Sequence, residues 1–185
     1  VHLAAYGSER GESLLGLLRR LETRPPSCRV RLSSLEPMEA GDALVELVAG
    51  GSVAAPHLHL PLQSGSDSVL RRMRRGMTAA RFRSLLERAA RVNPRVHLAT
   101  DVIAGFPGET AEEAAATEAL LAGLPLASLH VFPFSPRSGT GAAELSRAGA
   151  VPAAAVTRRA ARLRALDAEI RRRYASAHDG VDADL

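Results

Sequence analysis

The sequence predicts an α/β fold built on a parallel sheet, and three observations support this. Short apolar stretches alternate with longer segments of helical spacing along most of the 185 residues. The connections between them are short, and polar or glycine-rich turns follow the apolar stretches. Strands and helices that alternate in this way form parallel sheets with crossover helices. Five such strands cannot close an eight-stranded barrel, so an open sheet or a partial barrel is expected.

The strands are expected where short runs are apolar or alternate polar and apolar residues, as at His57-Leu58-His59-Leu60. They cover residues 1–6, 29–32, 57–60, 96–103 and 124–134. Helical spacing predicts helices over residues 14–21, 43–48, 67–74, 79–89, 110–121 and 153–174. Thr110 and Glu113 form an S/T-x-x-E capping box at the start of one of them. We therefore expect a barrel domain over 1–150, a C-terminal helix over 151–176 and a frayed tail over 177–185.

Composition narrows the functional classes. All 24 basic residues are arginine and the net charge is +4, which permits a polyanionic partner. Aromatic residues make up 3% of the chain, which argues against a base-stacking platform. No apolar run approaches the roughly 20 residues of a membrane helix, so no membrane association and a cytoplasmic location are expected. The one cysteine, Cys28, excludes an internal disulfide and a cysteine-only metal site, and we expect it to be structural.

Polar turns follow every predicted strand, and in a parallel arrangement these turns share the rim where such folds bind ligands. They are Tyr6-Gly7-Ser8, Ser33-Ser34-Leu35-Glu36, Gln63-Ser64-Gly65-Ser66-Asp67, Gly105-Phe106-Pro107-Gly108-Glu109 and Ser135-Pro136-Arg137. Gly105 and Gly108 would let the backbone approach a ligand and present helix N–H groups to an anion, or would only serve a tight turn. Asp101 lies among apolar residues. We expect it to bond a ligand hydroxyl or the N–H groups of a neighbouring turn, with a structural role as the alternative.

Two further groups of residues have a functional and a structural interpretation. His57 and His59 share one face of a strand, and a metal site would need His97 or His130 to converge from other strands. The sequence favours histidines satisfied within the core. The arginines near residues 71–75 and 158–173 either contact phosphates or form solvated helix faces.

Four stretches together resemble a known family. They are residues 31–37 (Arg-Leu-Ser-Ser-Leu-Glu-Pro), 57–67, 100–110 and 132–140, and they resemble the radical S-adenosylmethionine (SAM) methylthiotransferases. The Ser-Ser-Leu-Glu-Pro form resembles the branch that methylthiolates carbon 2 of threonylcarbamoyladenosine next to the tRNA anticodon. Other branches act on isopentenyladenosine in tRNA or on an aspartate of a ribosomal protein.

The resemblance implies a partial (β/α)6 barrel of radical SAM type, of which this chain would supply strands two to six and a C-terminal helix. It implies SAM and two 4Fe-4S clusters in the full-length protein. One cluster reduces SAM to a 5′-deoxyadenosyl radical, the other supplies sulfur, and a second SAM supplies the methyl group. The implied partners are the tRNA anticodon loop and an electron donor such as flavodoxin or ferredoxin, with the protein a monomer.

The resemblance also assigns residues by their place in the matching motifs. The implied SAM-binding residues are Tyr6, Gly7, Ser33, Glu36, Gln63, Ser64, Asp101, Gly105, Pro107, Gly108, Glu109, Phe132, Phe134 and Ser135. The expected RNA contacts are Arg71, Arg74, Arg137, Arg158 and Arg162.

The chain also departs from the family pattern. It lacks the C-x-x-x-C-x-x-C cluster motif, the N-terminal domain with three more cluster cysteines, and the C-terminal RNA-binding β-barrel. Met77 and Ser138 replace the usual tyrosine and proline. No catalytic residue and no metal ligand is assigned, and the chain alone is expected to be inactive. The alternative of another class is a cluster-free nucleotide- or RNA-binding α/β module without catalysis.

Overall fold

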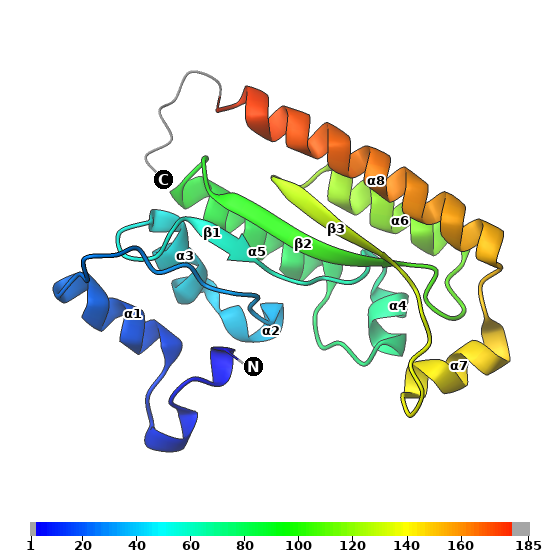
Figure 1. Cartoon of the computed structure of the whole chain (residues 1–185), viewed down its shortest axis with the longest axis horizontal. Helices are drawn as coiled ribbons and strands as arrows, with labels where there is room; N and C mark the ends of the chain where they lie inside the picture. The colour runs from blue at the N-terminus through cyan, green and yellow to red at the C-terminus, as the bar shows by residue number, and fades with distance from the viewer. Residues whose placement is uncertain (1–2, 179–185) are drawn as a thin grey trace.

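The computed structural model describes residues 3–178, and its strands form a three-stranded parallel sheet in the order β1-β2-β3 (Figure 1). The strands are β1 (His57–His59), β2 (His97–Ala104) and β3 (Ser128–Pro133). In the register, His59 lies opposite Ala99 and Asp101 lies opposite His130. The parallel α/β class and the open, partial-barrel form that the sequence predicts are confirmed.

Eight α-helices and two short 3-10 helices accompany the sheet in the described part of the chain. The α-helices are α1 (Leu14–Thr23), α2 (Pro37–Ala40), α3 (Asp42–Gly50), α4 (Asp67–Arg72), α5 (Ala79–Val92), α6 (Ala111–Ala122), α7 (Gly141–Gly149) and α8 (Ala153–Ser176). The 3-10 helices are η1 (Leu3–Ala5) and η2 (Ser8–Arg10). Thr110 and Glu113 form the predicted capping box of α6, with both reciprocal bonds present.

One face of the sheet packs on helices and forms the core. Leu58, Leu98 and Val102 are fully or almost fully buried there, in one cluster with apolar side chains of α5, α6 and α8. Because strand side chains alternate between faces, the residues between them point the other way. We call this other side, which carries His57, His59, His97, Asp101 and His130, the inner face.

Two of the five predicted strands are wrong. Leu3–Ala5 is 3-10 helical, and residues 1–2 lie outside the described part of the chain. In the 29–32 stretch only Val30 makes a bridge, to Ala54, although the stretch does run beside β1 and the Leu35 N–H bonds the His59 carbonyl. Within residues 3–178 no strand forms on the outer side of this segment, so it has one partner there and a regular ladder is not stabilised.

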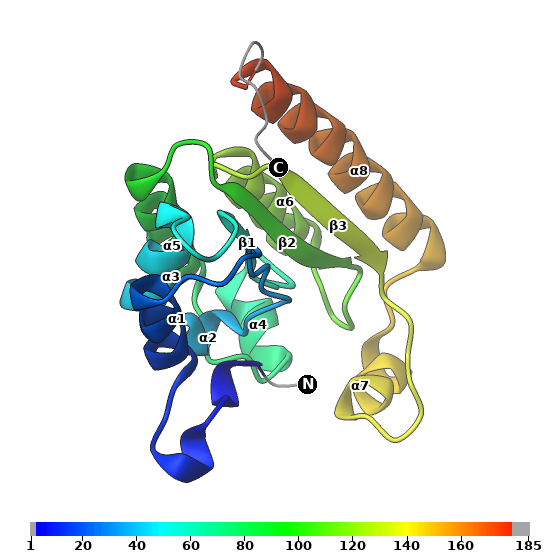
Figure 2. The same ribbon diagram turned by 60° about the vertical axis from the view of Figure 1, so that its left-hand side comes forward.

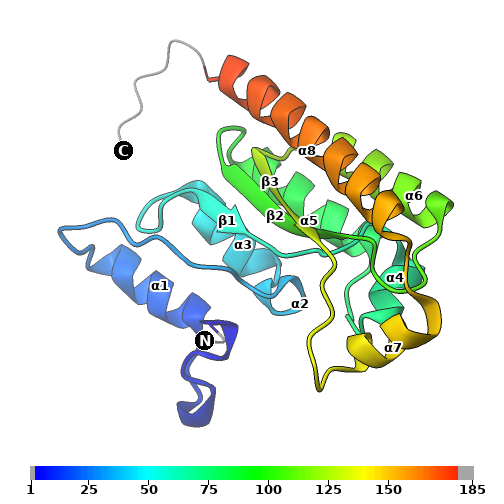
Figure 3. The same ribbon diagram turned by 45° about the vertical axis from the view of Figure 1, so that its right-hand side comes forward.

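The long C-terminal helix is confirmed, but the preceding α7 was not predicted. Helix α8 runs along the outer edge of β3 (Figures 1 and 3). There the Asp167 carboxylate accepts the N–H of Leu129 at 2.7 Å, so a free donor of the edge strand is satisfied by a side chain. The frayed tail over 177–185 lies mostly outside the described residues, which end at residue 178. Within residues 3–178, no helix is both long and apolar enough to cross a membrane.

Candidate functional site

The inner face borders a cavity of about 530 Å³. Nine of its eleven lining residues are arginine, histidine or serine: Arg31, Leu32, Ser33, Ser34, His57, His59, His97, Ala99, Ser128, His130 and Arg171. The imidazoles come from all three strands, because they occupy alternate positions that the core does not use. Their convergence is the main feature of the site that the sequence prediction did not favour.

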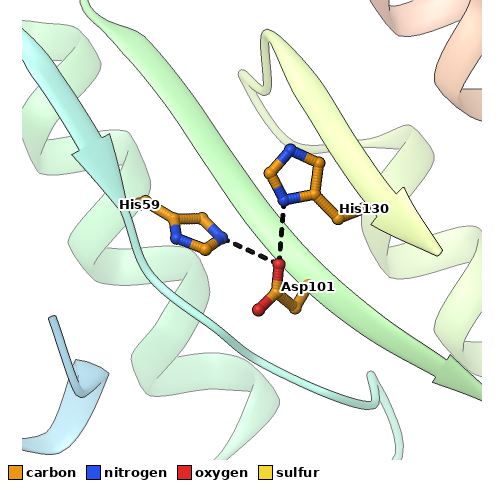
Figure 4. A group of neighbouring side chains, drawn as sticks. All are labelled: His59, Asp101 and His130. Atoms are coloured by element: carbon orange, nitrogen blue, oxygen red, sulfur yellow. Dashed lines mark hydrogen bonds and ion pairs between the residues drawn. The ribbon is translucent and has the colours of Figure 1, made fainter. Parts of the chain in front are cut away.

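At the centre of this face, one oxygen of Asp101 accepts hydrogen bonds from two histidines (Figure 4). The Oδ1 atom lies 2.8 Å from His59 Nε2 and 3.0 Å from His130 Nδ1. Burial would raise the pKa of Asp101, but the two histidines outweigh it and hold the pKa below its usual range. Asp101 therefore has side-chain partners on its own sheet, and the expectation of bonds to a neighbouring turn is corrected.

The amino ends of the strands carry a second pair of imidazoles. His57 and His97 stack with ring centroids 5.0 Å apart, and Arg31 Nη2 lies 2.8 Å from His57 Nε2. Burial first, and the positive charge of Arg31 second, lower the pKa of His57 to about 4. His57 is therefore neutral near pH 7 and accepts the hydrogen bond from Arg31.

The turn after β1 is held against α6. Ser64 is fully buried and its hydroxyl lies 3.2 Å from that of Thr117. A Cβ on Gly65 would come within 2.7 Å of the Thr117 Cα, so glycine is required by this close approach. Gln63 takes a positive φ of 78°, which is unusual for a residue with a side chain. Such backbone strain gathers at ligand-binding segments.

The turn after β2 is held against α8. The N–H of Gly105 donates to Glu109 Oε2 at 2.9 Å, and Arg159 binds the same oxygen at 2.7 Å. Burial raises the pKa of Glu109, although both of these partners act to lower it. The N–H of Gly108 is bonded to the Gly149 carbonyl. The N–H groups of Gly105 and Gly108 are thus used within the fold.

A larger cavity of about 770 Å³ lies at the carboxyl ends of the strands, between α4 and α7. It is lined by Gln63, Arg71, Arg72, Met73, Arg74, Arg75, Ile103, Phe106, Gly141, Ala142, Glu144 and Leu145. Arg72 is paired with Glu113 at 2.6 Å and Arg75 with Glu36 at 2.8 Å. Arg71 and Arg74 are exposed.

The other predicted site residues do not gather in one place. Gly105, Pro107 and Phe134 line a separate cavity of about 280 Å³ against α8. Phe132 is exposed on β3, and Ser135 and Arg137 are exposed beyond it. Tyr6 and Gly7 lie in the N-terminal segment outside the sheet (Figure 2). On α8, Arg158 is exposed and Arg162 is paired with Glu118 at 2.9 Å.

Comparison with known proteins identifies the family to which this chain belongs. The family described as "Radical SAM superfamily" matches residues 6–121. The chain belongs to this superfamily. Among solved structures, the radical SAM enzyme coproporphyrinogen III oxidase (HemN) from Escherichia coli matches with a TM-score of 0.66 and 18% identity, over 83% of this chain and 36% of that one. The archaeal Elp3 of Methanocaldococcus infernus gives a TM-score of 0.55 at 17% identity, over 85% and 38%. These two likenesses concern the fold.

Curated relatives of this radical SAM chain are tRNA methylthiotransferases. Threonylcarbamoyladenosine tRNA methylthiotransferase MtaB of Thermotoga maritima is 38% identical over 82% of this chain, and that of Bacillus subtilis is 36% identical over 97%. The tRNA-2-methylthio-N(6)-dimethylallyladenosine synthase of Parafrankia sp. is 43% identical over 90% of it. The chain spans 34–40% of the length of these relatives.

Of the two cofactors of the superfamily, SAM and an Fe–S cluster, this chain fits only SAM. The 770 Å³ cavity at the carboxyl ends of the strands, lined by Gln63, four arginines and apolar side chains, is large enough for an adenosyl ligand. An Fe–S cluster needs several cysteine thiolates. The sequence has one cysteine, Cys28, which is exposed and free. The residues of this chain therefore do not fit a cluster of the cysteine-ligated kind.

Proposed function

We propose that the protein containing this chain is a radical SAM tRNA methylthiotransferase that acts on threonylcarbamoyladenosine next to the anticodon. The supporting observation is the identity to two MtaB proteins, which extends over 82% and 97% of the chain. The Ser33-Ser34-Leu35-Glu36-Pro37 stretch favours the same branch. Because the chain spans 35–40% of the length of these relatives, the proposed activity is that of a longer protein.

In this proposal the chain supplies the binding surface for SAM, which when bound is the source of the 5′-deoxyadenosyl radical and of the methyl group. Gln63 is the implied SAM residue that lines the large cavity, and Arg75 bound to Glu36 closes one side of it. Ser64 and Glu109 act by fixing the turns after β1 and β2, since both are buried in contacts with helices. Their role would be to position the backbone around the ligand.

The tRNA would lie against the exposed arginines near that cavity. Arg71 and Arg74 are exposed on its wall, and Arg137 is exposed in the loop before α7. Phosphate contacts of this kind make binding salt-dependent. We expect Arg71→Ala combined with Arg74→Ala to weaken tRNA binding several-fold and to reduce its salt dependence, in a gel-shift assay. Arg91→Ala combined with Arg95→Ala is the matched control, because both arginines are exposed and lie outside the two arginine groups considered for phosphate contact, and it should change little.

The remaining parts of the proposal concern the whole protein. It would be cytoplasmic and monomeric, and it would take electrons from a flavodoxin or ferredoxin. Size-exclusion chromatography with light scattering tests the monomer directly.

The activity test is nucleoside analysis. The gene that encodes the whole protein is expressed in a host that lacks its own tRNA methylthiotransferases, and the tRNA is digested and analysed by mass spectrometry. We expect the 2-methylthio derivative of threonylcarbamoyladenosine to appear. If neither threonylcarbamoyladenosine nor dimethylallyladenosine is methylthiolated, the proposal fails. Retained tRNA binding would then favour the non-catalytic binding module.

A second substrate has its own support. The Parafrankia dimethylallyladenosine synthase is 43% identical over 90% of this chain, which is a higher identity than that of either MtaB. Appearance of the 2-methylthio derivative of dimethylallyladenosine in the same experiment would assign the protein to that branch.

A further inference from the structure

Three potential metal ligands meet on the inner face, and none of them lines the cavity proposed for SAM. His59 Nε2, Asp101 Oδ1 and His130 Nδ1 all lie within 4.8 Å of one another (Figure 4). They come from three adjacent strands, with Asp101 in the central one and directly opposite His130 in the register. The sheet therefore fixes the three side chains relative to one another.

We propose that His59, Asp101 and His130 bind one divalent transition-metal ion of the zinc type, with an open coordination position toward the 530 Å³ cavity. Two histidines and one carboxylate are the protein ligands of many catalytic zinc and non-haem iron sites, which keep a further position for water or substrate. The site goes beyond the proposed function and does not depend on it, since all three ligands belong to this chain.

The geometry is close to what such an ion needs. In a tetrahedral zinc site with bonds of about 2.0–2.1 Å, neighbouring ligand atoms lie about 3.3–3.4 Å apart. The two distances to Asp101, 2.8 and 3.0 Å, are hydrogen-bond lengths and are shorter by a few tenths of an ångström, so an ion would replace these bonds after a small outward rotation of the side chains. The third ligand atom belongs to His130, whose side chain is 49% exposed, so its ring can turn without disturbing the core.

The surroundings support the ligands. Ser34 Oγ lies 2.6 Å from His59 Nδ1, the ring nitrogen that does not face Asp101. Metal-binding histidines commonly bond through their second nitrogen in this way, and the bond fixes the tautomer and the ring orientation. The nearby cations are engaged elsewhere, because Arg31 bonds to His57 and Arg171 to Asp167.

The alternative is a hydrogen-bond cluster that only stabilises the sheet. In that case the two histidines donate to Asp101 and no ion binds. In both interpretations a variant of these residues can lose stability, so stability does not distinguish them. The quantity that does is the affinity for a metal ion.

The experiment is a titration of the full 185-residue chain, without an affinity tag, with Co²⁺ followed by Zn²⁺. Cys28→Ser is introduced throughout, because the exposed thiol of Cys28 would bind both ions. Visible d–d absorption reports Co²⁺ in a low-coordinate site, and thermal melting with zinc and then with a chelator reports binding by stabilisation. We expect one ion per chain, displacement of Co²⁺ by Zn²⁺, and a melting temperature that rises with zinc.

The variants test the assignment to these residues. Asp101→Asn and His130→Ala should each weaken binding at least tenfold, and Ser34→Ala should weaken it less. His97→Ala is the matched control, since His97 lines the same cavity but lies outside the ligand group. If Asp101→Asn does not fold, His130→Ala still decides, because His130 is exposed. Absence of binding in the Cys28→Ser chain, or binding unchanged in His130→Ala, would overturn the proposal.

Discussion

The turn after β2 and the inner face of the same sheet carry similar polar residues but differ in what surrounds them. In the turn, the side chains of Glu109 and Arg159 are only 3% and 12% exposed, and the Gly105 N–H completes the cluster. On the inner face, the side chains of Asp101 and His130 are 18% and 49% exposed, and His130 lines an open cavity. Polar residues on and after these strands are therefore of two kinds, and only those beside open space are free to bind a ligand.

The largest expected effect is on the buried pair of the turn. Glu109→Ala leaves the Gly105 N–H without its partner and leaves Arg159 with only the carbonyl of residue 109. We expect a loss of about 3–5 kcal/mol in the free energy of unfolding. Glu118→Ala is the control, because its partner Arg162 is 58% exposed, and it should cost no more than about 1 kcal/mol. Urea denaturation measures both. Equal losses would show that the turn is not held by this buried pair.

Gly105→Ala should be nearly as damaging. Gly105 has a φ of 79°, and a Cβ there would lie 2.5 Å from Val156 Cγ2 of α8. Left-handed strain and overpacking together predict a loss of about 2–4 kcal/mol. Gly139 has a φ of 78° but nothing within 4 Å, so Gly139→Ala should show only the backbone cost of about 1–2 kcal/mol. Adding Val156→Ala to Gly105→Ala should restore part of the difference in the same urea experiment.

A smaller effect should appear as acid sensitivity. The Arg72 hydrogen bond is the main cause that lowers the pKa of Glu113 to about 2, from an ordinary value of 4.5. A carboxyl whose folded pKa is depressed contributes stability above its ordinary pKa and loses it as the pH falls toward the folded value. The melting temperature should therefore fall between pH 5 and pH 2. Glu113→Gln should flatten this dependence, while Glu87→Gln, in an exposed pair, should leave it unchanged. An identical acid profile for Glu113→Gln would contradict the assignment.

The smallest effect is expected on the inner face. Ser34→Ala removes one hydrogen bond, to His59, from an exposed side chain, and should cost less than about 1 kcal/mol without metal. Ser33→Ala, the neighbouring exposed serine, is the control. A loss comparable to that of Glu109→Ala would mean that the inner face holds the fold together as the turn does.

The sequence predicted those parts of the fold that depend on local patterns. The alternation around His57–His59 and the apolar run around His97–Ala104 predict both strands, and Thr110 with Glu113 predicts the start of α6. The expected strand over 29–32 failed because a strand also needs partners, and these are supplied by distant segments. Helix α7 was missed although Thr140 caps it, because glycines at both of its ends resemble a loop.

The candidate site was predictable only in part, because it too depends on contacts between distant segments. Asp101 was expected to need a partner, and alternation already placed His59 on one face of its strand, but the parallel register that brings His130 opposite Asp101 is not written in local sequence. Ser64 and Glu109 carry the same sequence signals as residues that face open space. Their burial is decided by α6 and α8, which pack on them from elsewhere in the chain.

The Asp167 contact has a consequence for self-association. A parallel sheet with an open edge can recruit a strand from another molecule, which is a common start of aggregation. On the β3 side, the carboxylate of Asp167 already occupies the N–H of Leu129, and α8 covers the edge. Intermolecular pairing through this sheet would have to begin on the β1 side, where the segment around Val30 offers only an irregular partner. Helix α8 thus protects the β3 edge from intermolecular strand pairing and leaves the β1 side as the edge where aggregation would start.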